Sequence, residues 1–446
     1  MDNLIINGQR KLKGEVNISA AKNSVLPIIA ASLLATEEVT IINAPMLDDV
    51  FTLCNVIEEL GFNISINKLC NTIKIKEGSS LKICPNEDLV RKMRASFLIM
   101  GPMLSKYGEF RLTRPGGCNI GNRPIDLHLK GLKTLGAEIT IDKNGGIIAK
   151  AKRLIGERIY LDFPSVGATE NLMMAAVLAK GTTIIENAAQ EPEIVDLGNF
   201  LNALGGKVYG QGTRKITIDG VESLKGGKYS PIYDRIEAGT FMIAAAITGS
   251  TIRINGVNED YCRPLIEKLK ECGVEFVFLN NGYSAIVNGK SRLRAVDIKT
   301  MPYPGFPTDM QSQMMSLLCL VNGSSIITET VFENRFMNVD ELIRMGAHIK
   351  VVGRTAFVEG VDKLLGCKVQ ATDLRAGAAL VLASLAAEGT SIVTDVFHID
   401  RGYVNIENKL KGIGADIRRI AVQYKKLWNL IFHSFLYYKI CNIEEE

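Results

Sequence analysis

A short pattern that recurs six times along the chain constrains the fold more than any other feature of the sequence. Each copy consists of the end of an amphipathic helix, a glycine, and a short strand in which apolar and polar residues alternate. A glycine directly after a helix takes the left-handed conformation at the least cost. The six glycines are Gly61, Gly136, Gly205, Gly273, Gly346 and Gly414, at spacings of 75, 69, 68, 73 and 68 residues. We therefore expect six similar units of about 70 residues each.

A second pattern precedes the first within most units. A helix rich in alanine and leucine runs into Gly-Thr or Gly-Ser and then into a strand, with clear copies at Gly181, Gly249, Gly323 and Gly389. Degenerate copies cover residues 33–42 and 106–112. One such unit buries too little apolar surface to be stable alone, so the units must pack on one another. The periodicity leaves open whether they form one ring or two clusters of three.

The composition excludes several classes of protein. The chain has 446 residues, of which 47% are hydrophobic and 22% charged, which is typical of a globular protein. The net charge of +4 is small and the charges are interspersed, which disfavours a nucleic-acid binder but allows local anion sites. The first residues lack the features of a signal peptide. The nine cysteines form no C-x-x-C pair and the four histidines are scattered, so we expect no disulfide framework, no metal site and a reducing cytoplasm.

Residues 114–128 combine the composition of a loop with reactive side chains. Three glycines and two prolines in this stretch prevent a continuous helix or a central strand. Cys118 follows two glycines, and Arg114 and Arg123 flank it with positive charge, which lowers the pKa of a thiol and suits a phosphate or carboxylate ligand. A loop that carries a reactive group is typical of an active-site lid. We interpret five other cysteines, in apolar patterns, as small core residues: Cys54, Cys262, Cys272, Cys319 and Cys367.

Charged residues also stand where helices are expected to begin. Lys22 and Asn23 precede an apolar helix and could bind an anion there, or they could be a solvated lysine and a capping residue. Asp309 follows a Pro-Thr turn, where it is either a helix cap or a general base for a substrate hydroxyl. Further charged breaks between strands and helices contain Arg94, Arg335, Asp373, Arg375 and Arg401. So many cations at such breaks indicate convergence on one polyanionic ligand.

Taken together, these stretches resemble the UDP-N-acetylglucosamine 1-carboxyvinyltransferases, the enolpyruvyl transferases of peptidoglycan synthesis. The resemblance covers about residues 1–420 and rests on ordered motifs at 21–23, 93–96, 115–128, 165–169, 306–311, 332–336, 372–375 and 398–403. It implies an α/β fold, a two-domain inside-out α/β barrel built from six βαβ-type repeats, with helices inside and sheets outside. One domain is expected to combine residues 1–21 with 233–420, and the other to span 22–232 and carry the Cys118 lid loop. Residues 421–446 are an extension of unknown role.

The resemblance also implies a reaction. The enolpyruvyl group of phosphoenolpyruvate moves to the 3′-hydroxyl of UDP-N-acetylglucosamine and phosphate leaves, by addition and elimination through a tetrahedral intermediate. This is the first committed step of peptidoglycan synthesis. We expect no cofactor, no metal, no nucleic acid, no membrane span, a cytoplasmic location and a monomer.

The resemblance assigns roles to particular residues of this chain. Lys22, Arg123 and Arg401 are expected to hold the phosphate and carboxylate of phosphoenolpyruvate. Cys118 is expected to donate a proton to the substrate methylene and to form a covalent adduct, and Asp309 to accept the proton of the 3′-hydroxyl. Contacts to the nucleotide sugar are assigned to Asn23, Arg94, Arg123, Pro124, Ile125, Asp126, Leu127, Ser165, Val166, Gly167 and Val331. Support of domain closure is assigned to Arg335, Asp373 and Arg375.

The sequence departs from this family in two places. Phe163-Pro164 stands where some members have a basic residue, which affects one contact on the uridine side. The apolar stretch 428–440 holds the only tryptophan; it is too short for a transmembrane helix and is interpreted as an interfacial helix, a segment docked on the protein, or disorder.

Three rival functions share some of these sequence features. The sister transferase that uses shikimate 3-phosphate shares the sixfold repeat but lacks the Pro-Gly-Gly-Cys lid. A non-catalytic repeat scaffold explains the repeats but not the charged breaks. A catalytically inactive paralogue stays open.

Overall fold

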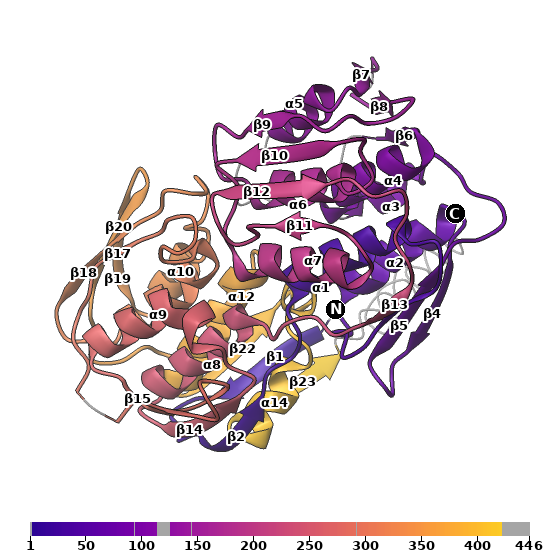
Figure 1. Ribbon diagram of the computed structural model, residues 1–446. Coiled ribbons are helices and arrows are strands. Elements are labelled where there is room, and N and C mark those ends of the chain that lie inside the picture. Colours follow the sequence, from indigo (N-terminus) through magenta and orange to yellow (C-terminus); the bar gives the residue numbers. More distant parts are fainter. Residues whose placement is uncertain (1, 93, 114–124, 144, 291, 422–446) are drawn as a thin grey trace, which may run out of the picture.

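The computed structural model describes residues 2–92, 94–113, 125–143, 145–290 and 292–421, with the side chains of residues 89, 91, 92 and 94 outside the description. Figure 1 shows two lobes, each with helices surrounded by sheets. Within the described residues the strands form six separate sheets, one for each predicted repeat, and the sequence-based expectation of an α/β fold with six units is confirmed.

Three sheets come from the first half of the chain. Their strand orders are β13(Gly227–Tyr229)-β3(Val39–Ile41)-β5(Thr72–Lys76)-β4(Asn63–Asn67), then β6(Glu109–Leu112)-β8(Ile147–Lys150)-β7(Glu138–Ile141), and then β11(Val208–Tyr209)-β12(Lys215–Asp219)-β10(Thr182–Glu186)-β9(Arg158–Tyr160).

The other three sheets combine the second half of the chain with its first residues. Their strand orders are β15(Glu275–Leu279)-β16(Ser284–Asn288)-β14(Thr251–Asn255)-β2(Lys13–Asn17), then β17(Ile298–Lys299)-β18(Ser324–Thr328)-β20(Thr355–Glu359)-β19(His348–Val352), and then β21(Lys368–Gln370)-β22(Thr390–Thr394)-β1(Asp2–Asn7)-β23(Asp416–Ala421).

The glycines of the repeat have the predicted backbone conformation. All six have φ values between 94° and 112°, the left-handed region that a side chain would disfavour. Each is followed by a strand, for example β4 after Gly61 and β23 after Gly414. Five of the sheets contain two antiparallel strand pairs and one parallel pair, as where β10 pairs antiparallel with β12 and parallel with β9. The repeat is therefore a βαβ unit extended by a hairpin.

The helices fill the interior. Those of the first half are α1(Lys22–Ala31), η1(Ser32–Leu34), α2(Asp48–Glu59), α3(Glu87–Lys92), η2(Arg94–Ile99), α4(Met100–Tyr107), α5(Asp126–Thr134), α6(Val166–Ala176) and α7(Pro192–Ala203). Those of the second half are α8(Arg235–Ile247), α9(Glu259–Cys272), η3(Thr308–Met310), α10(Gln311–Leu318), α11(Val339–Arg344), α12(Leu374–Ala386), α13(Phe397–Asp400) and α14(Ile406–Gly412).

The alanine-rich helices lie at the centre of the fold. In α8 every residue after Arg235 is buried, and α8, α10 and α12 pack against one another. A helix that is apolar on all sides is stable only inside a core, and alanine lets neighbouring backbones approach closely. Among the helices in the described part of the chain, none is long and apolar enough to cross a bilayer.

The apolar core is divided into two clusters. One contains buried residues between Val25 and Leu224, and the other combines residues between Leu4 and Ile18 with residues between Ile236 and Ile417. The N-terminal strands join the second cluster because β1 pairs with β22 and β23, and β2 pairs with β14 (Figure 1). The domain boundaries predicted at 21–22 and 232–233 stay predictions, and the predicted extension 421–446 lies outside the described residues except for Ala421.

Candidate active site

Lys22 and Arg401, two predicted ligands of phosphoenolpyruvate, meet at one carboxylate. Lys22 is the first residue of α1, Arg401 follows α13, and Asp49 lies in the first turn of α2. Nζ of Lys22 is 2.5 Å from Oδ2 of Asp49, and Nε of Arg401 is 2.9 Å from Oδ1. The site therefore joins residues that are far apart in the sequence and come from both core clusters.

The solvated interpretation of Lys22 and the capping interpretation of Asn23 are wrong. Only 12% of the Lys22 side chain is exposed, and the residue before α1 is Ala21, with no side-chain cap. Burial lowers the pKa of Lys22, the positive charges of Arg375 and Arg401 lower it further, and the carboxylate of Asp49 opposes the shift. Asp49 itself is buried, yet Lys22 and Arg401 outweigh the cost of burial and lower its pKa.

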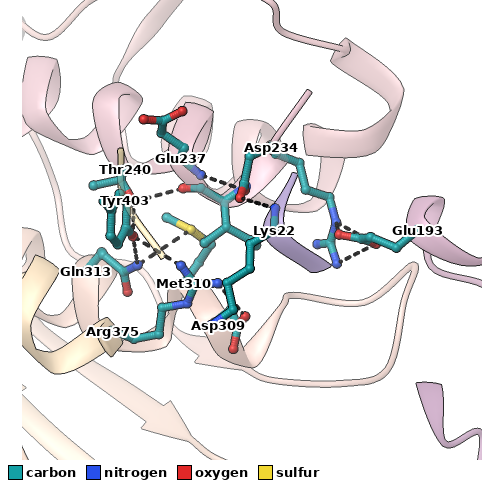
Figure 2. A network of polar contacts seen from close by, with 12 residues as sticks. Lys22, Glu193, Asp234, Glu237, Thr240, Asp309, Met310, Gln313, Arg375 and Tyr403 are labelled. Atoms are coloured by element: carbon teal, nitrogen blue, oxygen red, sulfur yellow. Dashed lines mark hydrogen bonds and ion pairs between the residues drawn. The ribbon is translucent and has the colours of Figure 1, made fainter. Parts of the chain in front are cut away.

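Asp309 lies between two buried arginines. Nη2 of Arg335 is 2.5 Å from Oδ1 of Asp309, and Nη2 of Arg375 is 2.8 Å from Oδ2. Both guanidinium groups are nearly inaccessible to water, and they stabilise the negative charge of the carboxylate. The alternative of a simple helix cap is wrong, because η3 and α10 begin without a side-chain cap and the Asp309 carboxylate pairs with the arginines instead. Figure 2 shows Arg375 beside Asp309.

A hydrogen-bonded tyrosine fixes Arg375 from behind. Tyr403 is buried, and its hydroxyl lies 2.9 Å from Oγ1 of Thr240, 3.3 Å from Nε2 of Gln313 and 3.4 Å from Nη1 of Arg375 (Figure 2). Asp373 caps α12 and accepts hydrogen bonds from the backbone N–H of Arg375. The sequence predicted Asp373 and Arg375 as site residues, but it gave no signal for Thr240 or Gln313.

Glu329 is a further residue of the site that sequence reasoning missed. It is buried, its Oε2 accepts a hydrogen bond from Thr308 at 2.9 Å, and its Oε1 accepts one from the backbone N–H of Val331 at 2.8 Å. One carboxylate therefore positions both the turn that carries Asp309 and the predicted nucleotide-sugar contact Val331.

A buried ion pair connects the two core clusters next to the site. Nε of Arg235, the first residue of α8, is 3.1 Å from Oε1 of Glu193 in α7, and the two side chains are 11% and 3% exposed (Figure 2). Asp234 caps α8, and its Oδ2 accepts a hydrogen bond from the backbone N–H of Lys22 at 3.4 Å. The start of α8 therefore meets both α1 and α7.

The predicted Ser165–Gly167 contact lies at the start of α6. Ser165 caps the helix and accepts a hydrogen bond from the backbone N–H of Ala168, and Val166 is the first helical residue. A Cβ at Gly167 would lie 3.3 Å from Cε1 of His128, so a side chain there would crowd the neighbouring helix α5. Phe163, a departure from the family predicted from the sequence, is 46% exposed.

Several predicted residues lie beyond what the structure describes. Cys118, Arg123 and Pro124 are outside the described residues, as is the side chain of Arg94, whose backbone begins η2. Ile125 precedes α5, Asp126 and Leu127 open this helix, and Asn23 is the second residue of α1. Among the described residues no group of histidine, cysteine, aspartate or glutamate could hold a metal ion.

The five cysteines interpreted as core residues have the environment of unreactive thiols. Cys54, Cys262, Cys272 and Cys319 are buried and Cys367 is partly buried. Burial raises the pKa of Cys54, Cys262 and Cys319 to about 12 and that of Cys272 to about 11. Because the thiolate is the reactive form, these residues are poor nucleophiles at neutral pH.

Comparison with known proteins identifies the class to which this fold and site belong. The sequence profile described as "EPSP synthase (3-phosphoshikimate 1-carboxyvinyltransferase)" matches residues 6–410. The enolpyruvyl transferase NikO from Streptomyces tendae superimposes with a TM-score of 0.84 at 25% identity, over 95% of this chain and 99% of NikO. The EPSP synthase of Acinetobacter baumannii shares the fold, with a TM-score of 0.74 at 20% identity over 94% of this chain and 100% of that structure. The class is that of the enolpyruvyl transferases.

Sequence relatives narrow the class to one family. UDP-N-acetylglucosamine 1-carboxyvinyltransferase 1 of Clostridium perfringens is 66% identical over 421 residues, which cover 94% of this chain and 100% of the relative. The corresponding enzyme 2 of Clostridium tetani is 60% identical over 94% of this chain and 100% of that relative. Enzyme 1 of Staphylococcus epidermidis is 53% identical with the same coverage. The chain belongs to the family of UDP-N-acetylglucosamine 1-carboxyvinyltransferases.

Proposed function

We propose that this chain transfers the enolpyruvyl group of phosphoenolpyruvate to the 3′-hydroxyl of UDP-N-acetylglucosamine and releases phosphate. The observation that carries the proposal is that the charge of Lys22 interacts with those of Arg375 and Arg401, while Arg375 pairs with the carboxylate of Asp309, at the boundary between the two core clusters. A substrate with a phosphate and a carboxylate needs several fixed cations, and a hydroxyl that attacks carbon needs a nearby proton acceptor. The relatives at 53–66% identity carry the name of this reaction.

In the proposed site the cations hold phosphoenolpyruvate and Asp309 faces the acceptor. Lys22 and Arg401, with Arg123 from the loop outside the described residues, bind the phosphate and carboxylate. The nucleotide sugar lies along the starts of α5 and α6, at Asp126, Ser165 and their neighbours, with Asn23, Arg94 and Val331 completing its site. Arg335, Asp373 and Arg375 form the rigid support on the side of the second core cluster.

The reaction has two stages. In the addition, the 3′-oxygen forms a bond to C2 of phosphoenolpyruvate, its proton passes to Asp309, and C3 gains a proton to become a methyl group. In the elimination, C3 loses a proton, the bond between C2 and the phosphate oxygen breaks, and inorganic phosphate leaves. The two arginines fix the orientation of Asp309, so its carboxylate orients the hydroxyl for attack. The role of Cys118 as the proton donor to C3 and as the site of a covalent adduct rests on the family resemblance.

The proposal is tested by phosphate release from phosphoenolpyruvate with and without UDP-N-acetylglucosamine. We expect release that depends on the nucleotide sugar and stops when fosfomycin adds its mass to Cys118. Shikimate 3-phosphate is the control acceptor, and release with that acceptor alone would contradict the assignment. No release with either acceptor would favour the inactive paralogue. The buried cysteines serve as internal controls, since Cys54, Cys262 and Cys319 should gain no adduct.

Three further expectations remain proposals. The two core clusters support a division into a domain of residues 22–232 and a domain of residues 1–21 with 233–420. A cytoplasmic location and a monomeric state follow from the composition and the family resemblance.

A further inference from the structure

Asp49 touches both cations of the proposed phosphoenolpyruvate site, although its sequence context gave no sign of this. Lys22 lies 2.5 Å from one carboxylate oxygen, and Arg401 lies 2.9 Å from the other. A second guanidinium nitrogen of Arg401 donates to Oδ2 at 3.4 Å. Lys22 and Asp49 flank residues of one core cluster, whereas Arg401 lies among residues of the other. The carboxylate therefore holds together two cations that come from different halves of the molecule.

The carboxylate is the least exposed of the three side chains. The side chain of Asp49 is 7% exposed, that of Lys22 is 12% exposed and that of Arg401 is 31% exposed. Arg401 therefore offers an anion from water more accessible surface than the carboxylate does. The position of Asp49 in the first turn of α2 lets the helix N-terminus stabilise its charge.

We propose that Asp49 is a positioning residue for phosphoenolpyruvate, which fixes Lys22 and Arg401 at one point on the boundary between the two core clusters. This inference rests on the proposed function. Two long cationic side chains would otherwise repel each other and lose much conformational entropy on meeting one ligand. A carboxylate that pairs with both cations offsets their repulsion and restricts their side chains before the substrate binds. Asp49 touches neither substrate in this arrangement and acts only through the two cations.

The charges around Lys22 make this role visible in a pH profile. Lys22 faces Asp49 on α2, Arg375 on α12 and Arg401 after α13, and Asp234 at the start of α8 accepts a hydrogen bond from its backbone. Burial and the two arginines lower the pKa of Lys22, and Asp49 is the group that opposes them. Without the charge of Asp49 the lysine loses its proton at a lower pH. The alkaline limb of kcat/KM for phosphoenolpyruvate then moves to lower pH.

The test compares Asp49→Asn with Asp48→Asn in the full-length protein. Both changes remove one negative charge from the first turn of α2, but Asp48 is exposed, and its charge interacts with that of Arg401 without the ion pairs that Asp49 makes. For Asp49→Asn we expect kcat/KM for phosphoenolpyruvate to fall roughly ten- to a hundred-fold, with the KM for UDP-N-acetylglucosamine changed less than about twofold. Asp48→Asn should behave as the wild type. Asp49→Glu, which keeps the charge, should restore the position of the alkaline limb.

Several outcomes would overturn the inference. A wild-type value of kcat/KM in Asp49→Asn, tighter binding of phosphoenolpyruvate in that variant, or equal losses for both substrates would each do so. If Asp49→Asn does not fold, Asp49→Glu is measured in its place. An alkaline limb of kcat/KM that moves to lower pH in Asp49→Glu, although the negative charge is kept, would then overturn the inference. If the wild type binds phosphoenolpyruvate but releases no phosphate, the proposed reaction fails instead. Titration calorimetry then decides the role of Asp49, because equal Kd values for wild type and Asp49→Asn would refute it.

Discussion

Nη2 of Arg375 lies 2.8 Å from Oδ2 of Asp309, although 66 residues separate the two in the sequence. Nη2 of Arg335 lies 2.5 Å from the other carboxylate oxygen, Oδ1. Both arginines are buried in the second half of the molecule, so the carboxylate has one orientation before any substrate binds. In the role of proton acceptor that we propose for it, Asp309 contributes to catalysis mainly through orientation and charge, and both contributions can be measured separately from substrate binding.

Replacing Asp309 with asparagine should affect turnover more than binding. Asparagine keeps the size of the side chain but cannot accept a proton, so we expect kcat to fall by roughly 10²- to 10⁴-fold. The KM for phosphoenolpyruvate should change little, because its proposed ligands are the cations. Steady-state phosphate release measures both constants. The control is Asp362→Asn, which removes one charge at an exposed position, and a kcat within about twofold of wild type in Asp309→Asn would argue against the assigned role.

The ion pair between Arg235 and Glu193 should contribute strongly to stability only as a pair. Replacing Arg235 with methionine leaves a buried carboxylate without its partner, near Glu170 and Glu191, so we expect a loss of about 3–5 kcal/mol in the free energy of unfolding. The double variant Arg235→Met with Glu193→Gln should recover most of this loss. Urea denaturation of the single and double variants gives the coupling energy.

The control for that cycle is an exposed ion pair. Nζ of Lys363 is 2.5 Å from Oε2 of Glu388, but the two side chains are 60% and 50% exposed. Lys363→Met should therefore change the free energy of unfolding by less than about 1 kcal/mol. If Lys363→Met and Arg235→Met lowered the free energy of unfolding equally, burial would not be the cause of the effect at Arg235.

The buried hydroxyl of Tyr403, which lies next to Arg375, should contribute to the stability of the protein. Tyr403→Phe removes the partner of Thr240, Gln313 and Arg375 inside the core, and we expect a loss of about 1–3 kcal/mol in the free energy of unfolding. Tyr160→Phe, at a side chain that is 58% exposed, should leave stability unchanged. Thermal unfolding compares the two, and equal melting temperatures for the variants would show that the buried network adds nothing.

Glu170 should make the protein less stable as the pH rises. Burial, reinforced by the charges of Glu193 and Glu191, raises the pKa of Glu170 well above its usual value. A carboxyl with a raised pKa in the folded state adds stability at low pH, and this contribution is lost as the pH rises through the folded pKa. Glu170→Gln, which cannot ionise, should therefore have a higher melting temperature than the wild type at alkaline pH, and the difference should shrink as the solution is acidified.

A surface glutamate provides the control of opposite sign. The hydrogen bond from Arg158 lowers the pKa of Glu186, so its contribution is present at neutral pH and is lost on acidification. Glu186→Gln should lower the melting temperature slightly at neutral pH. If both variants shifted in the same direction at alkaline pH, the raised pKa of Glu170 would not be the cause.

The sequence by itself determined the repeat and much of the candidate site. The glycine of each unit predicted a helix end and a strand at Gly61 and at its five counterparts, because only glycine adopts a positive φ without cost. The alanine- and leucine-rich pattern before Gly249 and Gly389 predicted the helices that the structure shows as α8 and α12. The motifs also singled out Lys22 and Asp309, because a charged residue at an expected helix start can be recognised from the sequence alone.

The tertiary structure alone decided which of these residues meet. Nothing in the local sequence of Asp49 distinguishes it from its exposed neighbour Asp48, since burial depends on the approach of Lys22 and Arg401 from distant segments. The same holds for Glu193 and Arg235, whose pairing requires that the two core clusters lie against each other. The periodicity could not choose between one ring and two clusters, because every unit has the same pattern whichever neighbours it packs against. Local sequence specifies backbone conformation through short-range sterics, whereas the charge and burial of a site arise from contacts over hundreds of residues.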